Sequence, residues 1–288
     1  MELRVDRLTK QYGKKIAVDR ISATFTKGVY GLLGANGSGK TTFMRMLADV
    51  LTPTSGEISV DGTSIYQLDE EYRDMIGYLP QHFGVYNNFT AMDFLMYLSA
   101  AKGIDKHTAR RKAEEVLSTV GLSNEAKAKV KTFSGGMKQR LGIAQTLLND
   151  PAIILLDEPT AGLDPKERIR FRNLISEISK NRIVILSTHI VSDIESIASQ
   201  ILLIKEGQLL NQGTVKELAS LAMGRVWSVF ADQQTAEKMK GNYLISNIRN
   251  TDTGVELRII SNTAPTKEAT NVIPTLEDVY LYYFKEEN

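Results

Sequence analysis

The sequence predicts an α/β fold with a mainly parallel sheet, an antiparallel β edge, a helical subdomain and a small α+β domain at the C-terminus. Short apolar segments at residues 29–33, 153–156 and 183–186 are typical of strands that are buried on both faces. Apolar residues with helical spacing lie between these segments, as at residues 165–178. This alternation of strand and helix indicates parallel strands that are covered by helices.

The character of the pattern changes along the chain, and the changes predict the domain organisation. Residues 3–25 read as strands, and the short strand at residues 57–62 ends in Asp-Gly, which is a hairpin signal. A helical pattern then dominates, and after residue 218 short antiparallel strands follow. We therefore predict a core domain over residues 1–218, with its helical subdomain at about 86–150, and an accessory domain over residues 219–288.

The composition excludes several classes of protein. Of the 288 residues, 42% are hydrophobic and 24% are charged, and the net charge is +1, so no nucleic-acid partner is expected. The chain has no cysteine, which excludes disulfides and thiolate metal sites. Its longest aliphatic run, residues 152–156, is far shorter than the roughly 20 residues that span a bilayer. We expect a cytoplasmic location, with any membrane component supplied by another chain.

A glycine-rich segment predicts a phosphate-binding site. Residues 34–41 match the pattern G-x-x-x-x-G-K-[ST], and they lie between a predicted strand and a predicted helix whose apolar residues continue to Val50. Backbone N–H groups of such a loop point at an anion, Lys40 would bring its charge to the β- and γ-phosphates, and the Thr41 hydroxyl would bind Mg²⁺. A glycine-rich turn that matches by chance is the alternative, and the flanking elements argue against it. The predicted nucleotide-binding residues here are Gly34, Asn36, Gly37, Ser38, Gly39, Lys40, Thr41 and Thr42.

Two acids follow a second apolar strand and complete the predicted ATPase site. Asp157 and Glu158 come directly after residues 153–156, at the carboxyl edge of the sheet, where ligands of such folds bind. We predict that Asp157 binds the metal and that Glu158 accepts a proton from the attacking water. Two solvated acids at a strand end would be the better interpretation if the phosphate loop were absent.

The segment 133–140, Phe-Ser-Gly-Gly-Met-Lys-Gln-Arg, resembles the signature loop of the ATP-binding-cassette (ABC) ATPases. Met137 stands where that family usually has glutamine, which removes a polar contact at this position only. The resemblance implies that Ser134, Gly135 and Gly136 close over the ATP held by a second ABC subunit, identical or different. An ordinary turn and helix cap is the alternative for Ser-Gly-Gly.

Further motifs of the same family occur in order over residues 3–214. Gln81 resembles the glutamine that senses Mg²⁺ and the membrane partner, and Asp164 resembles the aspartate that contacts the opposite subunit. His189 resembles the histidine that contacts the γ-phosphate, and Tyr12 is similar to the aromatic residue that stacks on adenine. A structural histidine and an exposed turn tyrosine are the alternatives for the last two. The implied fold is a P-loop NTPase of the ABC type, and the implied activity is hydrolysis of ATP with Mg²⁺.

The tail of the chain favours a role in transport. Residues 274–281 resemble the ending of cassettes that serve ABC-2-type exporters, including the bacitracin and lantibiotic group. The resemblance implies an ATPase subunit on the cytoplasmic face of the cell membrane, which energises a separately encoded permease, as an exporter. The alternative is a soluble single-cassette ATPase that acts on a cytosolic assembly or translation machine. Aromatic residues within 83–101 would either meet the membrane subunit or form core.

Overall fold

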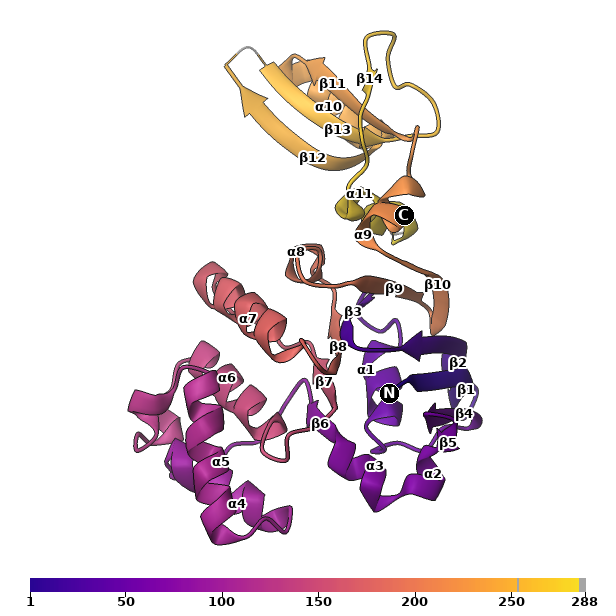
Figure 1. Ribbon diagram of the computed structural model, residues 1–288. Helices are drawn as coiled ribbons and strands as arrows, with labels where there is room; N and C mark the ends of the chain where they lie inside the picture. The colour runs from indigo at the N-terminus through magenta and orange to yellow at the C-terminus, as the bar shows by residue number, and fades with distance from the viewer. Residues whose placement is uncertain (253, 285–288) are drawn as a thin grey trace. The chain divides into compact units, whose positions relative to one another are not determined.

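The computed structural model describes residues 1–252 and 254–284, and its chain divides into two compact units that meet at residues 210 and 211 (Figure 1). The predicted domain boundary at residues 218–219 falls inside the helix α9 (Val215–Ser220), so it stays a prediction. Among the described residues, no helix combines the length and the apolar character needed to cross a bilayer.

An antiparallel sheet begins the first unit. Its strands, in the order β2-β1-β4-β5, are β1 (Leu3–Tyr12), β2 (Lys15–Phe25), β4 (Ser55–Val60) and β5 (Thr63–Ser64). Alternate side chains of β1, among them Leu3 and Val5, are buried, as one covered face requires. The turn between β4 and β5 places Asp61 at φ 48° and Gly62 at φ 84°, which is the left-handed geometry of a two-residue hairpin. The Asp-Gly hairpin signal is therefore confirmed.

A mainly parallel sheet of six strands forms the centre of the first unit (Figure 1). Its strands, in spatial order, are β10 (Gln208–Gly213), β9 (Gln200–Lys205), β3 (Gly28–Leu33), β8 (Ile183–Thr188), β7 (Ile153–Asp157) and β6 (Ile76–Leu79). The strands β3, β8 and β7 run parallel and in register, so that Leu33 lies beside Thr188 and Asp157 beside Ser187. The carboxyl ends of these three strands therefore meet at one edge of the sheet.

Helices cover this sheet and form the helical subdomain. They are α1 (Lys40–Leu47), α2 (Ile65–Leu68), α3 (Glu70–Met75), α4 (Ala91–Ala101), α5 (Lys106–Thr119), α6 (Gly135–Thr146), α7 (Pro165–Ile178) and α8 (Val191–Ile194), with 3₁₀ turns at Ser123–Glu125 and Val130–Thr132. The expectation that Val50 continues the apolar face of α1 is wrong, because the helix ends at Leu47 and Val50 is 57% exposed. Asp49 adopts a left-handed φ of 54°, which ends the helical path.

The second unit is a small α+β structure, as the sequence predicts. Its sheet has the order β12-β13-β11-β14, with β11 (Val226–Ala231), β12 (Leu244–Thr251), β13 (Gly254–Ile260) and β14 (Thr270–Asn271). It also contains α9, α10 (Gln233–Asn242) and α11 (Leu276–Tyr283). Ala236 and Met239 of α10 pack on Val229 and Leu257 of the sheet. Sequence reasoning missed α10, because these two residues are its only buried ones.

A buried ion pair attaches α11 to this sheet, and it makes the stability of the second unit depend on pH. Asp278 is 1% exposed and bonds to Arg258 at 2.7 Å, to Ser246 at 2.6 Å and to the N–H of Thr275 at 2.7 Å. Burial opposes ionisation of Asp278, but Arg258 and the other donors outweigh it, and the pKa of Asp278 is lowered.

We expect Asp278→Asn to destabilise the second unit by roughly 3 kcal/mol at neutral pH, because Arg258 keeps its charge without the partner. The folded pKa lies below the unfolded one, so the contribution is complete above the unfolded pKa and is lost as pH falls through the folded pKa. Thermal unfolding of the mutant and the parent should therefore converge at acidic pH. Glu277→Gln, at an exposed position of the same helix, is the control. An equal loss in both variants would contradict this account.

Candidate functional site

A cavity of about 670 Å³ lies over the glycine-rich loop at the carboxyl edge of the central sheet. It brings together most of the predicted nucleotide-binding and catalytic residues, namely Tyr12, Asn36, Gly37, Ser38, Gly39, Lys40, Thr41, Thr42, Gln81 and Glu158. It also includes residues that sequence reasoning missed, namely Lys15, Ile16, Ala17, Glu206 and Gly207. These come from β2 and from the turn between β9 and β10, so no local signal linked them to the loop.

The loop has its shape because two glycines allow the backbone to approach neighbouring strands. A Cβ atom on Gly39 would lie 2.4 Å from the carbonyl oxygen of Ala17, and Gly39 also has a left-handed φ of 103°. A Cβ atom on Gly34 would lie 2.2 Å from the carbonyl oxygen of Ile204. The N–H of Gly207 donates to the carbonyl oxygen of Ser38 at 2.9 Å. The loop is therefore held in place by the backbone of β2 and of the turn after β9, before any ligand binds.

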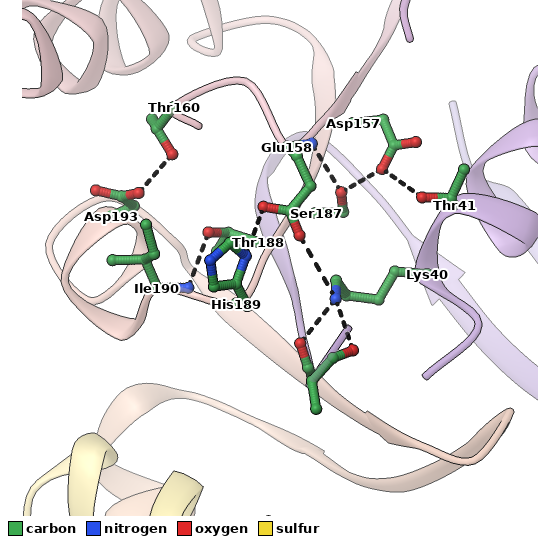
Figure 2. Close-up of polar contacts among 12 residues, drawn as sticks. Lys40, Thr41, Asp157, Glu158, Thr160, Ser187, Thr188, His189, Ile190 and Asp193 are labelled. Atoms are coloured by element: carbon green, nitrogen blue, oxygen red, sulfur yellow. Dashed lines mark hydrogen bonds and ion pairs between the residues drawn. The ribbon is translucent and has the colours of Figure 1, made fainter. Parts of the chain in front are cut away.

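Lys40 begins α1 and points into the centre of the site (Figure 2). Its side chain is 5% exposed, and Nζ donates to the carbonyl oxygens of Gly34 at 2.7 Å and of Ala35 at 3.1 Å. Nζ also lies 3.5 Å from Oε1 of Glu158. Burial lowers the pKa of Lys40, and the nearby Glu158 opposes this effect. Glu158 neutralises the buried Lys40 ammonium only in part, so this position favours an additional anion, such as a phosphate.

Asp157 ends β7 and is held from two sides. Ser187 donates to Oδ1 of Asp157 at 2.6 Å, and the Thr41 hydroxyl donates to the same oxygen at 3.2 Å (Figure 2). The other oxygen, Oδ2, is buried and has no hydrogen-bond partner within the described part of the chain. A carboxylate oxygen without a partner, beside a hydroxyl group, fits a hard cation such as Mg²⁺.

Asp157 and Thr41 offer oxygen donors, which are the ligands that Mg²⁺ prefers. Residues 1–252 and 254–284 contain no group of three or more His, Asp or Glu side chains that would surround a metal. Mg²⁺ is commonly bound through one or two carboxylates together with phosphate oxygens and water. Asp157 and Thr41 fit this arrangement.

Glu158 follows Asp157, directly after the carboxyl end of β7. Its φ is 49°, a left-handed value that is uncommon for a residue other than glycine, and it is 7% exposed. Its N–H donates to Ser187 Oγ at 3.0 Å, and its Oε2 lies 2.9 Å from Nδ1 of His189 (Figure 2). An ionised carboxylate only accepts hydrogen bonds, so Nδ1 of His189 carries the proton in this pair. The structure thus brings Lys40, Glu158 and His189 together.

The signature segment forms a separate surface of the same unit. Ser134 caps α6 by accepting from the N–H of Met137 at 3.2 Å, and both Ser134 and Gly135 are exposed. A Cβ atom on Gly136 would lie 2.7 Å from the side chain of Glu167, so a larger residue here would require that side chain to move. Asp164 caps that helix by accepting from the N–H of Glu167 at 2.9 Å.

The structure therefore does not bring all the predicted residues into one site. Ser134, Gly135, Gly136 and Asp164 are absent from the residues that line the phosphate-loop cavity, as far as the described ranges show. Gly34, Asp157 and His189 do not line the cavity either, but each is hydrogen-bonded to a residue that lines it. The signature segment therefore lies apart from the phosphate-loop cavity of its own chain.

Comparisons with known proteins place the chain in a family. A family profile described as "ABC transporter" matches residues 18–161. The ABC transporter ATP-binding protein YxlF of Bacillus subtilis strain 168 is 37% identical over 240 residues, which cover 83% of this chain and 78% of the relative. The bacitracin transport ATP-binding protein BcrA of Bacillus licheniformis is 42% identical over 208 residues, which cover 71% of this chain and 67% of the relative.

Solved structures support the same assignment. The dimeric structure of MJ0796, a bacterial ABC transporter cassette, superposes with a TM-score of 0.66 at 26% identity, covering 74% of this chain and 98% of that one. The same cassette in a post-hydrolysis state with ADP and Pi also has a TM-score of 0.66 at 26% identity and the same coverage. The phosphate loop, the acidic strand end and the signature segment all lie within or next to the matched region. The chain is an ATP-binding and ATP-hydrolysing member of the ABC transporter family.

Proposed function

We propose that this protein is the ATPase subunit of an exporter, and that it energises a separately encoded permease from the cytoplasmic face of the membrane. The observation that carries the proposal is the cavity in which the phosphate loop, Lys40 and Glu158 converge. The direction of transport is supported by relatives that are named for it, the Nod factor export ATP-binding proteins of Burkholderia species.

The phosphate loop binds the triphosphate of ATP. The backbone N–H groups at residues 36–39 and the N-terminus of α1 attract the phosphates, and the Lys40 ammonium neutralises the β- and γ-phosphates. Thr42, at the start of the same helix, adds a hydroxyl donor. Tyr12 is 48% exposed at the outer wall of the cavity, where its ring would stack on the adenine.

Asp157, Thr41 and Gln81 would hold Mg²⁺. When it is bound, this ion neutralises charge that develops on the phosphate oxygens. Asp157 would contribute its Oδ2, and the Thr41 hydroxyl lies beside it. Gln81, on the loop after β6, lines the same cavity and would contribute its amide oxygen.

Glu158 accepts the proton of the attacking water, and His189 holds the Glu158 carboxylate in position. Nδ1 of His189 donates to Oε2 of Glu158, and the other ring nitrogen could donate to the γ-phosphate only when the ring carries both protons. Oε1 of Glu158 faces Lys40. The base is therefore placed between the residue that binds the phosphate and the residue that orients the base itself.

A second copy of the chain completes the site. Ser134 and Gly135 are exposed at the N-terminus of α6, which carries a partial positive charge and free N–H groups. They do not line the phosphate-loop cavity of their own chain, so we infer that they contact the ATP bound by the other copy. Asp164, which begins the adjacent helix α7, would contact that copy as well.

An aromatic surface on the helical subdomain would receive the permease. Tyr86 and Tyr97 are 50% and 48% exposed, and their rings pack on each other and on Phe89 with centroids 5.0 to 6.0 Å apart. Phe94, in contrast, is 2% exposed and belongs to the core. Exposed tyrosines held rigidly by their neighbours are common at the centres of interfaces.

Recovery of the tagged chain from detergent-solubilised membranes tests this proposal. We expect a polytopic membrane protein to copurify, and we expect Tyr86→Ser with Tyr97→Ser to reduce its recovery at least about tenfold, as the loss of interface hot spots would. Tyr66→Ser removes a tyrosine that is 50% exposed elsewhere in the same unit, and it should have no effect. Copurification of ribosomal or assembly proteins in place of a membrane protein would contradict the proposal.

A further inference from the structure

One hydroxyl group connects both acids of the site. Ser187 lies near the end of β8, and the parallel register places it beside Asp157 of β7 and Leu32 of β3. Its side chain is fully buried. Its Oγ donates to Oδ1 of Asp157 at 2.6 Å and accepts the N–H of Glu158 at 3.0 Å (Figure 2). Both hydrogen-bonding roles of the hydroxyl are thus used by the two acidic residues.

The bond to the N–H of Glu158 stabilises an unusual backbone conformation. Glu158 has a φ of 49°, which is disfavoured for any residue that carries a Cβ atom, so surrounding contacts must hold it there. Its N–H is held by Ser187, and its carbonyl oxygen accepts the N–H of Ala161 at 3.2 Å. This turn directs the carboxylate away from the strand and toward Lys40 and His189.

The bond to Asp157 sets the rotation of its carboxylate. Ser187 and Thr41 both donate to Oδ1, and Oδ2 is the oxygen left without a partner. Without the Ser187 hydroxyl, Oδ1 would keep the longer Thr41 contact at 3.2 Å. The Asp157 carboxylate would then be held less firmly in its present rotation. Removal of a group that hydrogen-bonds to a metal-binding carboxylate typically lowers metal affinity or enzyme activity by about 10- to 100-fold.

We propose that Ser187 is a positioning residue that orients Asp157 and Glu158 at once, and so couples metal binding to the placement of the base. Both hydrogen bonds of Ser187 go to the two acidic residues, so Ser187 would act on the reaction only through them. The inference rests on the functions proposed above for Asp157 and Glu158.

Ser187→Ala should lower kcat by about 10- to 100-fold with KM for ATP changed by less than about threefold, because the phosphate loop keeps its own contacts. ATP affinity measured by calorimetry in EDTA should match that of the parent, whereas the gain in affinity on adding Mg²⁺ should be smaller. Ser187→Thr keeps the hydroxyl and should restore kcat to within about threefold of the parent. Rates are expressed per ATP-binding site counted by calorimetry, so misfolded protein does not contribute.

Ser199→Ala is the matched control. Ser199 also donates its hydroxyl within this sheet, to the carbonyl oxygen of Val29 at 2.7 Å, but at the start of β9 and far along the strands from the two acids. Equal kcat values per site for Ser187→Ala and Ser199→Ala would overturn the inference, and so would a Ser187→Thr variant as slow as Ser187→Ala. Glu158→Gln, assayed in parallel, separates the two proposals: if Glu158→Gln keeps the parent rate, the assigned role of Glu158 fails; if Glu158→Gln is slowed while Ser187→Ala keeps the parent rate, the inference about Ser187 fails.

Discussion

Glu158→Gln is expected to lower kcat for ATP hydrolysis by about 10²- to 10⁴-fold, because an amide cannot accept the proton of the attacking water. Glutamine keeps the shape of the side chain, which is 7% exposed, and it keeps an oxygen for the N–H of His189. Affinity for ATP should therefore stay within about threefold of the parent value. Single-turnover hydrolysis with radiolabelled ATP measures the rate, and calorimetry measures the affinity.

Glu195→Gln provides the control for this substitution. Glu195 is exposed beside the C-terminus of α8, and it lies outside the cavity. Its replacement should leave kcat unchanged. If Glu158→Gln hydrolysed ATP at a rate close to that of the parent, the general base would have to be another group.

Lys40→Ala should weaken binding of Mg·ATP by at least about 10- to 100-fold, which corresponds to the loss of charge-assisted hydrogen bonds worth about 1.5–3 kcal/mol. Lys40 is 5% exposed and lies 3.5 Å from Glu158, so its removal also leaves the Glu158 carboxylate buried without its cation. That carboxylate would then repel the γ-phosphate, which adds to the loss. Titration calorimetry with a non-hydrolysable ATP analogue measures the effect directly.

Lys27→Ala removes an exposed lysine from the turn before β3, at the opposite end of the strands, and it should bind ATP as the parent does. Thermal unfolding without nucleotide shows whether each variant is folded. A folded Lys40→Ala protein with the affinity of the parent would contradict the assignment of the phosphate site.

Sequence reasoning succeeded where the determinants are local. The phosphate loop and the Asp-Gly hairpin depend on neighbouring residues, and the structure contains both of them. Val50 shows the limit of this approach, because the left-handed conformation of the preceding Asp49 ends the helix before it. The spacing of apolar residues along the sequence does not show where such a helix ends.

The unpredicted parts of the site depend on contacts between distant segments. Ala17 and Gly207 shape the phosphate loop through backbone atoms, which have no signature in the amino-acid pattern. Ser187 lies two residues before His189, but the role proposed for it follows from the parallel register that places it beside Asp157. The pairing order of strands β3, β8 and β7 was needed to find it.

We propose that ATP is enclosed by the phosphate loop of one copy and the signature segment of another. Light scattering of Glu158→Gln with Mg²⁺ tests this most directly, because slow hydrolysis keeps ATP in place. We predict that saturating ATP raises the molar mass from that of one chain to that of two, and that Ser134→Arg, which fills the exposed cap of α6, prevents the change. A protein that binds one equivalent of ATP but keeps the mass of a single chain at every concentration would contradict the account.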